Sequence, residues 1–282
     1  MRLKRFSYLT SSQKENIGSN YYKKPDGVFH NVESVFSVGL LTLLHMDLNI
    51  YMLFRKQLGE YPLLKKLGEG KCSVCFFSET SDGIPVVVKY LKKKWFFLRK
   101  VRLHTEINAL SKVDHPAIPK VLGVLNEKYV KGFVMEYKPG KTLADMVLEE
   151  NKCFSFSETV NIYNKTLDVI AFLHGNGMIH RDINARNVMY HNHTISLIDF
   201  GFSQNAVEKP DRYQFDFARL ANLLLFLLYS DYHGASKGTW AEQLDLTAEQ
   251  MVFIKRLFGL LTPYQYISEV QNDFQLYFLS AI

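Results

Sequence analysis

Two acidic residues and an amide are grouped in one short stretch of the chain. Residues 178–201, MIHRDINARNVMYHNHTISLIDFG, hold an H-R-D-x-x-x-x-N string with Asp182 and Asn187, and Asp199 follows a short apolar run. A carboxylate, a neutral amide and a second carboxylate near one cleft can orient a hydroxyl group and hold Mg²⁺ against phosphates. The stretch therefore indicates a site that could move a phosphoryl group.

A glycine-rich segment, LGEGKCSVCF, precedes this stretch in the sequence. Gly68 and Gly70 have G-x-G spacing around Glu69, and Ser73 stands where a third glycine could be. Glycines let backbone amides come close to phosphate oxygens without a Cβ in the way. A plain hairpin turn fits this segment equally well when it is considered by itself.

A lysine and a glutamate could complete a phosphate site. Lys89 ends a run of three valines in VVVKY, and Glu106 lies seventeen residues later on a predicted helix. Such a lysine can meet the α- and β-phosphates of a nucleotide if an acid holds it. Either residue alone is more simply a solvated surface charge. The chance that all these motifs occur in this order by accident is below ~1%.

The first half of the chain is predicted to be mostly strand. The pattern gives a strand in residues 61–70, two strands in 74–91 joined by an Asp82-Gly83 turn, and two more in 118–137 around Asn126-Glu127. One helix is predicted from about Trp95 to Val113.

After Pro139-Gly140 the pattern becomes helical. Residues 142–150, 156–177 and 215–230 have helical period and length, and helix starts are expected at Ser157 and Thr247. We therefore predict an α+β fold with an antiparallel sheet and one main helix in an N-lobe, and a reduced, mainly helical C-lobe. The predicted parts are an N-terminal extension (1–55), an N-lobe (56–137) and a C-lobe (138–282), with the site in the cleft between the lobes.

With these motifs the chain resembles eukaryotic-type protein kinases from about residue 58 to residue 275. The resemblance implies that Lys89 contacts phosphates, that Glu106 pairs with it, and that Asp182 is the catalytic-loop aspartate. It also implies a nucleotide and metal site, in which Asn187 and Asp199 bind Mg²⁺ and Gly68, Glu69, Gly70, Ser73, Glu136 and Tyr137 bind ATP. His180 and Phe200 are expected to be packing residues, and Asp216 is expected to brace the catalytic loop.

The chain departs from the usual family pattern beside the catalytic aspartate. Asn184 stands where serine/threonine kinases usually carry a lysine, and Arg186 matches the tyrosine-kinase arrangement. One cation replaces the other, so both residues are predicted to serve catalysis and activity is expected to survive.

A second departure is the short segment between Asp199 and Asp216, which has sixteen residues. An ordinary activation loop with its A-P-E motif does not fit there, and Tyr266 replaces the arginine that would pair with that motif. The shortening resembles minimal bacterial serine/threonine kinases. It predicts a segment ordered without phosphorylation, with Arg181 bonded to nearby backbone or an acid.

The leading hypothesis is an ATP- and Mg²⁺-dependent kinase that acts on serine or threonine hydroxyls of proteins. A small-molecule hydroxyl is the alternative acceptor, favoured by the missing docking elements. A non-catalytic nucleotide-binding scaffold is the third hypothesis, and the complete set of lysine, acids and amide argues against it.

Composition and charge narrow the remaining possibilities. The chain has 282 residues, a net charge of +6 and three cysteines, which favours a reducing, cytoplasmic compartment and gives no argument for a nucleic-acid partner. No signal peptide is visible. The apolar residues 35–54 could associate with a membrane, but Asp47 opposes a span and helices packed on the protein are favoured. Cys72 and Cys75 form a C-x-x-C that is predicted to be structural.

Overall fold

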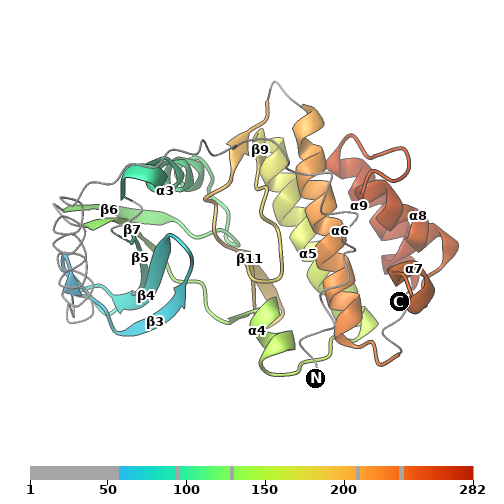
Figure 1. The fold of residues 1–282 in the computed structure, drawn as a ribbon, viewed down its shortest axis with the longest axis horizontal. Helices are drawn as coiled ribbons and strands as arrows, with labels where there is room; N and C mark the ends of the chain where they lie inside the picture. Colours follow the sequence, from blue (N-terminus) through green and yellow to red (C-terminus); the bar gives the residue numbers. More distant parts are fainter. Residues whose placement is uncertain (1–56, 93–95, 128–129, 208–209, 235–237, 282) are drawn as a thin grey trace, which may run out of the picture. The chain divides into compact units, whose positions relative to one another are not determined.

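The sheet of the strand-rich half is built from five antiparallel strands. The computed structural model describes residues 57–92, 96–127, 130–207, 210–234 and 238–281. The strands are paired in the order β3-β4-β5-β7-β6 (Figure 1). Their bounds are β3 (Lys65–Glu69), β4 (Ser73–Glu79), β5 (Pro85–Leu91), β6 (Val121–Glu127) and β7 (Val130–Glu136), preceded by a small pair, β1 (Gln57–Leu58) with β2 (Tyr61–Pro62).

One helix, α3 (Phe96–Leu110), packs against β5 and β7 of this sheet. The predicted strands and the predicted helix of this half are therefore confirmed. The predicted extension, including the apolar residues 35–54, lies outside the described residues. Among the helices that the structure describes, none combines the length and the apolar character that crossing a membrane requires.

The second half contains the helices. Two long helices, α5 (Phe156–Gly175) and α6 (Gln214–Ser230), lie side by side (Figure 1). The other helical elements are α4 (Leu143–Leu148), η3 (Pro210–Tyr213), α7 (Trp240–Gln243), α8 (Ala248–Leu257), α9 (Ile267–Tyr277) and η4 (Leu279–Ala281). The helices predicted in residues 142–150, 156–177 and 215–230 are confirmed.

Short strands connect the helices to the site. A three-stranded sheet has the order β11-β10-β8, with β8 (Lys141–Thr142), β10 (Val188–His191) and β11 (Thr194–Leu197). A second pair joins β9 (Met178–Ile179) to β12 (Gln204–Asn205). Gly140 links β7 to β8 with φ +105°, where a Cβ would collide with the carbonyl of Tyr190, so this junction requires glycine.

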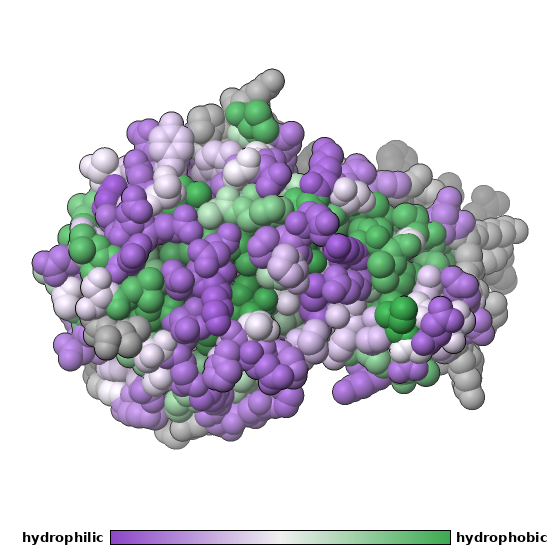
Figure 2. Space-filling view, turned by 180° about the vertical axis from the view of Figure 1, so that it is seen from behind, coloured by the Kyte–Doolittle hydropathy of each residue, from purple (hydrophilic) through white to green (hydrophobic). Residues whose placement is uncertain are grey.

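Apolar side chains from α5, α6, α8 and α9 form the core of the helical half. Fully buried residues there include Tyr163, Phe217, Phe253 and Phe274. On the face seen in Figure 2, hydrophilic residues cover most of the surface and hydrophobic residues occur in separate patches. The helices α8 and α9 are joined by Arg256, whose Nη1 lies 2.7 Å from Asp273.

The helix α5 begins at a residue different from the predicted one. Its N-cap is Ser155, whose hydroxyl accepts from the amide of Glu158, while the Glu158 carboxylate accepts from the Ser155 amide. The predicted start at Ser157 is therefore wrong by two residues, because Ser155 and not Ser157 has a glutamate three positions later. The predicted start at Thr247 is confirmed by the equivalent pair with Gln250.

This difference gives a test on stability. We expect Ser155→Ala to lower the free energy of unfolding by about 1 kcal/mol, because it removes an acceptor for the first turn of α5. The matched variant Ser157→Ala should change it by less than about 0.5 kcal/mol, since this exposed residue lies inside the helix. Urea unfolding of the wild type and the two variants measures both changes in the free energy of unfolding. Equal losses in the two variants would contradict the cap assignment.

Candidate active site

The position of Lys89 is set by the centre of the five-stranded sheet. Lys89 lies in β5, opposite Cys75 of β4 and Phe133 of β7. The neighbouring position of β7 is Gly132, where a Cβ would collide with the carbonyl of Lys89. Glycine therefore allows the close approach of the two backbones that hold this lysine in place.

The amine of Lys89 lies between two carboxylates from distant parts of the chain. Its Nζ is 2.7 Å from Oε1 of Glu106 on α3 and 3.1 Å from Oδ1 of Asp199. Burial by itself would lower the pKa of Lys89, but the two carboxylates outweigh it and hold that pKa above its ordinary value. The lysine therefore stays charged in a site where only 7% of it is exposed.

The two acids respond differently to this lysine. Burial raises the pKa of Glu106 against the effect of Lys89, and the nearby charge of Asp199 raises it further. For Asp199, burial opposes ionisation, but Lys89 and the amide of Gly201 prevail and lower its pKa below the ordinary value. Asp199 is therefore ionised near neutral pH, as a metal ligand must be.

The thiol next to this lysine is not reactive. Burial raises the pKa of Cys75 to about 11, although Lys89 acts to lower it. Cys72 and Cys75 are both free thiols. Among the described residues, neither lies in a cluster of three or more side chains that could bind a metal ion. Nothing in this geometry supports a metal or redox role for the C-x-x-C.

A hairpin brings Asn187 close to Asp199 in the fold. Strands β10 and β11 pair with Val188 opposite Leu197, and their two-residue turn has positive φ at Asn192 and His193. Asn187 directly precedes β10, and its carbonyl accepts from the amide of Ile198 at 2.9 Å. The register of this hairpin therefore sets the spacing of the two residues predicted to bind metal.

Two amides orient the carboxylate of Asp182. Nδ2 of Asn187 donates to Asp182 Oδ2 at 3.0 Å, and Nδ2 of Asn184 donates to Asp182 Oδ1 at 3.2 Å. Each amide also donates to the Asp182 carbonyl. The backbone amide of Arg186 donates to the Asn184 side chain, and the Arg186 side chain is exposed. The structure thus brings Asn184 and Asn187 to the Asp182 carboxylate, whereas Arg186 meets Asn184 through its backbone amide.

The catalytic loop is anchored by the buried carboxylate of Asp216 on α6. It accepts from the backbone amides of His180 at 2.9 Å and Arg181 at 2.6 Å, and it lies 2.9 Å from Nε2 of His174. Sequence reasoning missed His174, because no local pattern connects the end of α5 to an aspartate forty-two residues later. Arg181 has φ of +68°, a strained backbone that such anchoring sustains.

His180 and Phe200 form the packed floor of the loop, as expected. Both side chains are fully buried, and their rings meet edge to face with centroids 4.6 Å apart. Burial lowers the pKa of His180 below its ordinary value, although Asp216, Asp199 and Asp182 all act to raise it. The imidazole therefore serves as a neutral packing group.

The predicted nucleotide-binding residues lie at the edge and the end of the main sheet. Gly68 and Glu69 are in β3, and the amide of Gly70 donates to the Ser73 carbonyl across the turn to β4. The carboxylate of Glu69 pairs with Lys66 and Lys92, which lowers its pKa to about 2. The glutamate thus fastens the glycine-rich turn to the end of β5, a contact that the sequence did not reveal.

Glu136 and Tyr137, predicted to bind ATP, lie at the end of β7, with Glu136 as its last residue. The amide of Glu136 donates to the Lys120 carbonyl at 2.9 Å, so this donor is committed to the strand pair. The Glu136 carboxylate pairs with Lys138 at 2.9 Å. The ring of Tyr137 packs edge to face on Phe77, with centroids 5.0 Å apart. The Glu136 amide is therefore unsuited to bind adenine. The predicted adenine contact is then left to the Glu136 carbonyl and the backbone groups of Tyr137.

The donor set of the site fits a magnesium ion. The nitrogen of the Asn187 amide is turned toward Asp182, so its Oδ1 is the atom that could coordinate metal. Asp199 supplies an ionised carboxylate, one oxygen of which also contacts Lys89. Mg²⁺ prefers a few carboxylate or amide oxygens together with phosphate oxygens. Asn187 and Asp199 could hold such an ion next to the cation of Lys89.

The short segment after Asp199 is pinned at several points. β12 pairs with β9, the amide of Ala206 donates to Gly177, and the Tyr213 hydroxyl donates to the carbonyl of His174 at 3.3 Å. Ser203 is only 2% exposed. The guanidinium of Arg181 lies 5.2 Å from the ring centroid of Phe215, a contact different from the predicted bond to backbone or an acid.

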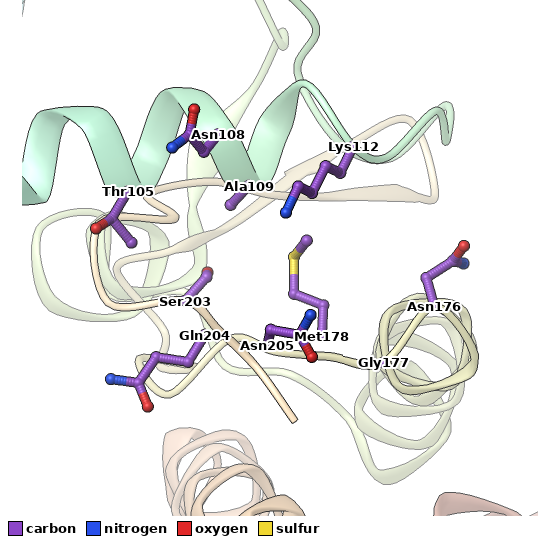
Figure 3. Close-up of a pocket in the computed structure, with 10 residues that line it drawn as sticks. All are labelled: Thr105, Asn108, Ala109, Lys112, Asn176, Gly177, Met178, Ser203, Gln204 and Asn205. Atoms are coloured by element: carbon purple, nitrogen blue, oxygen red, sulfur yellow. The ribbon is translucent and has the colours of Figure 1, made fainter. Parts of the chain in front are cut away.

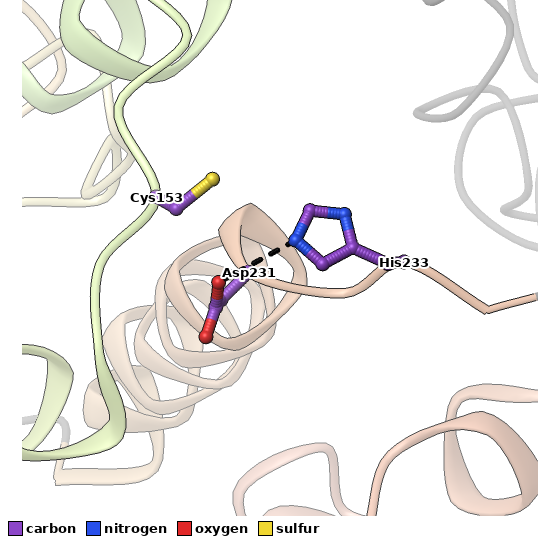
Figure 4. Close-up of side chains that lie close together, drawn as sticks. All are labelled: Cys153, Asp231 and His233. Carbon is purple, nitrogen blue, oxygen red and sulfur yellow. Dashed lines mark ion pairs between the residues drawn. The ribbon is translucent and has the colours of Figure 1, made fainter.

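A second group of possible metal ligands lies elsewhere on the surface. The sulfur of Cys153, before α5, is near Asp231 and His233, which follow α6 (Figure 4). Asp231 and His233 are 3.7 Å apart, and all three residues are exposed. Exposed acidic groups of this kind are common without a metal ion. We therefore connect metal binding only with Asn187 and Asp199.

Comparisons with known proteins agree with this geometry. The family model for the protein kinase domain matches residues 61–223. A probable serine/threonine-protein kinase of Bacillus subtilis, YbdM, is 31% identical over 227 residues, which cover 76% of this chain and 88% of that protein.

Two eukaryotic relatives match a smaller share. Cyclin-dependent kinase F-3 of rice is 28% identical over 64% of this chain and 42% of its own length. Calcium/calmodulin-dependent protein kinase type 1 of Caenorhabditis elegans is 29% identical over 51% of this chain and 43% of its own length. This chain thus spans less than half of either protein. The matched region holds Lys89, Asp182 and Asp199, and the chain belongs to the protein kinase family.

Proposed function

We propose that this chain transfers the γ-phosphoryl group of ATP to serine or threonine hydroxyls of proteins. The observation that carries the proposal is the position of Lys89, 2.7 Å from Glu106 and 3.1 Å from Asp199. An active kinase needs this lysine paired with the helix glutamate and the metal-binding aspartate in place. Membership of the family supports the use of ATP with Mg²⁺.

Each residue of the site has a separate task in this proposal. Lys89 binds phosphate oxygens, and bound magnesium supplies positive charge that offsets charge on the transferring group. Asp182 orients the acceptor hydroxyl and accepts its proton, while Asn184 and Asn187 hold the carboxylate in position. Arg186, exposed beside Asn184, provides the cation that a lysine usually supplies at this loop.

The choice of acceptor rests on similarity and on the loop. The similar proteins from Bacillus subtilis and other organisms are named serine/threonine kinases. The brevity of the segment between Asp199 and Asp216 favours a second candidate, a kinase of small-molecule hydroxyls, because little chain is available to dock a peptide. The two functions use the same catalytic groups and differ only in what approaches Asp182.

The acceptor can be identified directly. We expect purified protein with γ-labelled ATP and Mg²⁺ to label a generic protein substrate, and acid hydrolysis to release phosphoserine or phosphothreonine. The same reaction is run with a metabolite pool and with no added acceptor. Label found only in small molecules would favour the second candidate, and no transfer to any acceptor would refute catalysis.

Replacement of the catalytic aspartate tests its role. Asp182→Asn should lower kcat by about 10²–10⁴-fold, because it removes the proton acceptor. Nucleotide affinity should stay unchanged, since Lys89 and Asp199 are untouched. The matched control is Asp245→Asn, an exposed aspartate outside the site. Steady-state rates and ATP titrations measure the two quantities. Equal turnover of wild type and Asp182→Asn would contradict the assignment.

The pinned segment predicts activity without phosphorylation. Ser203 is buried and the Tyr213 hydroxyl is hydrogen-bonded, so neither is presented to a modifying enzyme. We expect phosphatase treatment of the purified protein, and separately Tyr213→Phe, to change the transfer rate by less than tenfold. A larger loss, about 1.4 kcal/mol or more in the barrier, in either experiment would show that the segment needs a phosphate.

A further inference from the structure

A separate cavity of about 240 Å³ lies between α3 and the segment that contains β12 (Figure 3). Lys112 and Ala109 bound it on the side of α3, Met178 of β9 lies at its centre, and Ser203 and Asn205 bound the opposite side. The residues of the candidate active site, Lys89, Asp182 and Asp199 among them, do not line it. This cavity is therefore distinct from the nucleotide site.

A hydroxyl without a partner marks the deep end of the cavity. Ser203 is 2% exposed, and its Oγ finds no hydrogen-bond partner among the described residues. In Figure 3 this hydroxyl points toward α3, into the cavity. A buried hydroxyl that lacks a partner carries a free-energy penalty of about 1–3 kcal/mol. A ligand that accepts a hydrogen bond from Ser203 would relieve this penalty.

Two further donors face the mouth of the cavity. The exposed side chain of Lys112 extends from the end of α3 with its amine toward Met178 (Figure 3). Asn205 Oδ1 already accepts from the Val207 amide at 2.9 Å, so the nitrogen of this side chain is the group presented to the cavity. Lys112, Asn205 and Ser203 thus line the same cavity, with the Met178 side chain drawn between the first two in Figure 3.

The charge of the lining favours an anion. None of the ten described residues that line the cavity carries a carboxylate, and Lys112 supplies a positive charge. Gln204, on the same strand as Asn205, has its oxygen engaged by Arg212 at 3.1 Å. The oxygens of these two amides are thus both committed within the protein, which leaves nitrogen donors rather than acceptors available there.

We propose that this cavity binds a small phosphomonoester. Lys112, Ser203 and Asn205 offer three donors, which match the three terminal oxygens of a phosphate group better than the two of a carboxylate. The methyl of Ala109 and the thioether of Met178 provide an apolar surface for the organic part of the ester. The volume exceeds that of inorganic phosphate alone, so an organic ester fills it better.

Both sides of the cavity belong to segments that carry active-site residues. On α3, Ala109 lies three residues after Glu106, and Ser203 follows Asp199 by four residues. A ligand bonded to both sides holds α3 against the segment, and so favours the arrangement in which Lys89 contacts both acids. This effect on catalysis rests on the proposed function, whereas the binding itself does not.

The binding test uses glycerol 2-phosphate as the probe. The full chain is first saturated with Mg²⁺ and a non-hydrolysable ATP analogue, so that the nucleotide site cannot take up the phosphate. Titration calorimetry should then give saturable binding with a Kd of about 1 mM or tighter. Glycerol, which lacks the phosphate, should not bind. A phosphoserine peptide in a parallel titration distinguishes a free ester from a modified protein as the source.

Variants connect the binding to this cavity. We expect Lys112→Gln and Ser203→Ala each to weaken binding of glycerol 2-phosphate at least tenfold. The matched control Lys255→Gln, which removes a helix lysine on α8, should bind like wild type. Near-identical melting temperatures without the probe establish that the variants fold. Absence of saturable binding to wild type, or unchanged affinity in Lys112→Gln, would overturn the proposal.

A rate measurement tests the coupling separately. At saturating probe, phosphoryl transfer by wild type should rise at least about twofold, and transfer by Lys112→Gln should not. Saturable binding with no change in the wild-type rate would overturn the coupling but keep the site. If wild type binds the probe but transfers no phosphoryl group with or without it, the proposed function would be refuted and the cavity assignment kept.

Discussion

The structure of the site depends on one buried cation held by two carboxylates. Lys89 comes from the central sheet, Glu106 from α3 and Asp199 from the segment after β11. Lys89 and Glu106 are buried, and removing charged groups from water is costly unless they satisfy one another. The contact is therefore favourable only when strand, helix and hairpin are all in their places. An interaction of this kind makes the assembly of the site all-or-none.

The carboxylate of Asp216 holds the catalytic loop in place. Asp216 binds two successive backbone amides, those of His180 and Arg181, from a fully buried position on α6. It keeps Arg181 in a left-handed conformation and so directs the next residue, Asp182, toward the amides of Asn184 and Asn187. Because the loop is braced from inside the helical half, it does not depend on a long activation segment. This explains how a sixteen-residue connection can coexist with an ordered site.

Local sequence patterns predicted most strands and helices, because a buried strand and a one-sided helix each require a characteristic spacing of apolar residues. The continuous run of valines before Lys89 indicated a buried strand, and the apolar spacing of α5 and α6 indicated helices. The start of α5 was missed although Ser155 and Glu158 have the capping-box spacing, because Ser157 offered a competing candidate. The turn predicted at Asn126-Glu127 was wrong, because these residues are the last two of β6 and pair with Lys131 and Val130 of β7.

Contacts between distant residues were predictable only where a family motif names both partners. Lys89 with Glu106 and Asp216 with the loop are of this kind. Glu69 with Lys92, His174 with Asp216, and Arg181 against Phe215 depend on packing that no local spacing encodes. The cavity beside Ser203 belongs to the same class, since it exists only once α3 faces β12. The role of a residue that departs from the family pattern, such as Asn184 in place of lysine, could be assigned only from its hydrogen bonds in the structure.

The most direct test of this account is a double-mutant cycle on Lys89→Met and Glu106→Gln, with kcat/KM for phosphoryl transfer as the readout. If Glu106 acts by holding Lys89, the double variant should transfer no more slowly than Lys89→Met alone, because the glutamate has nothing left to position. If the two losses instead multiply, the residues act independently and the paired lysine is not the interaction on which the site depends.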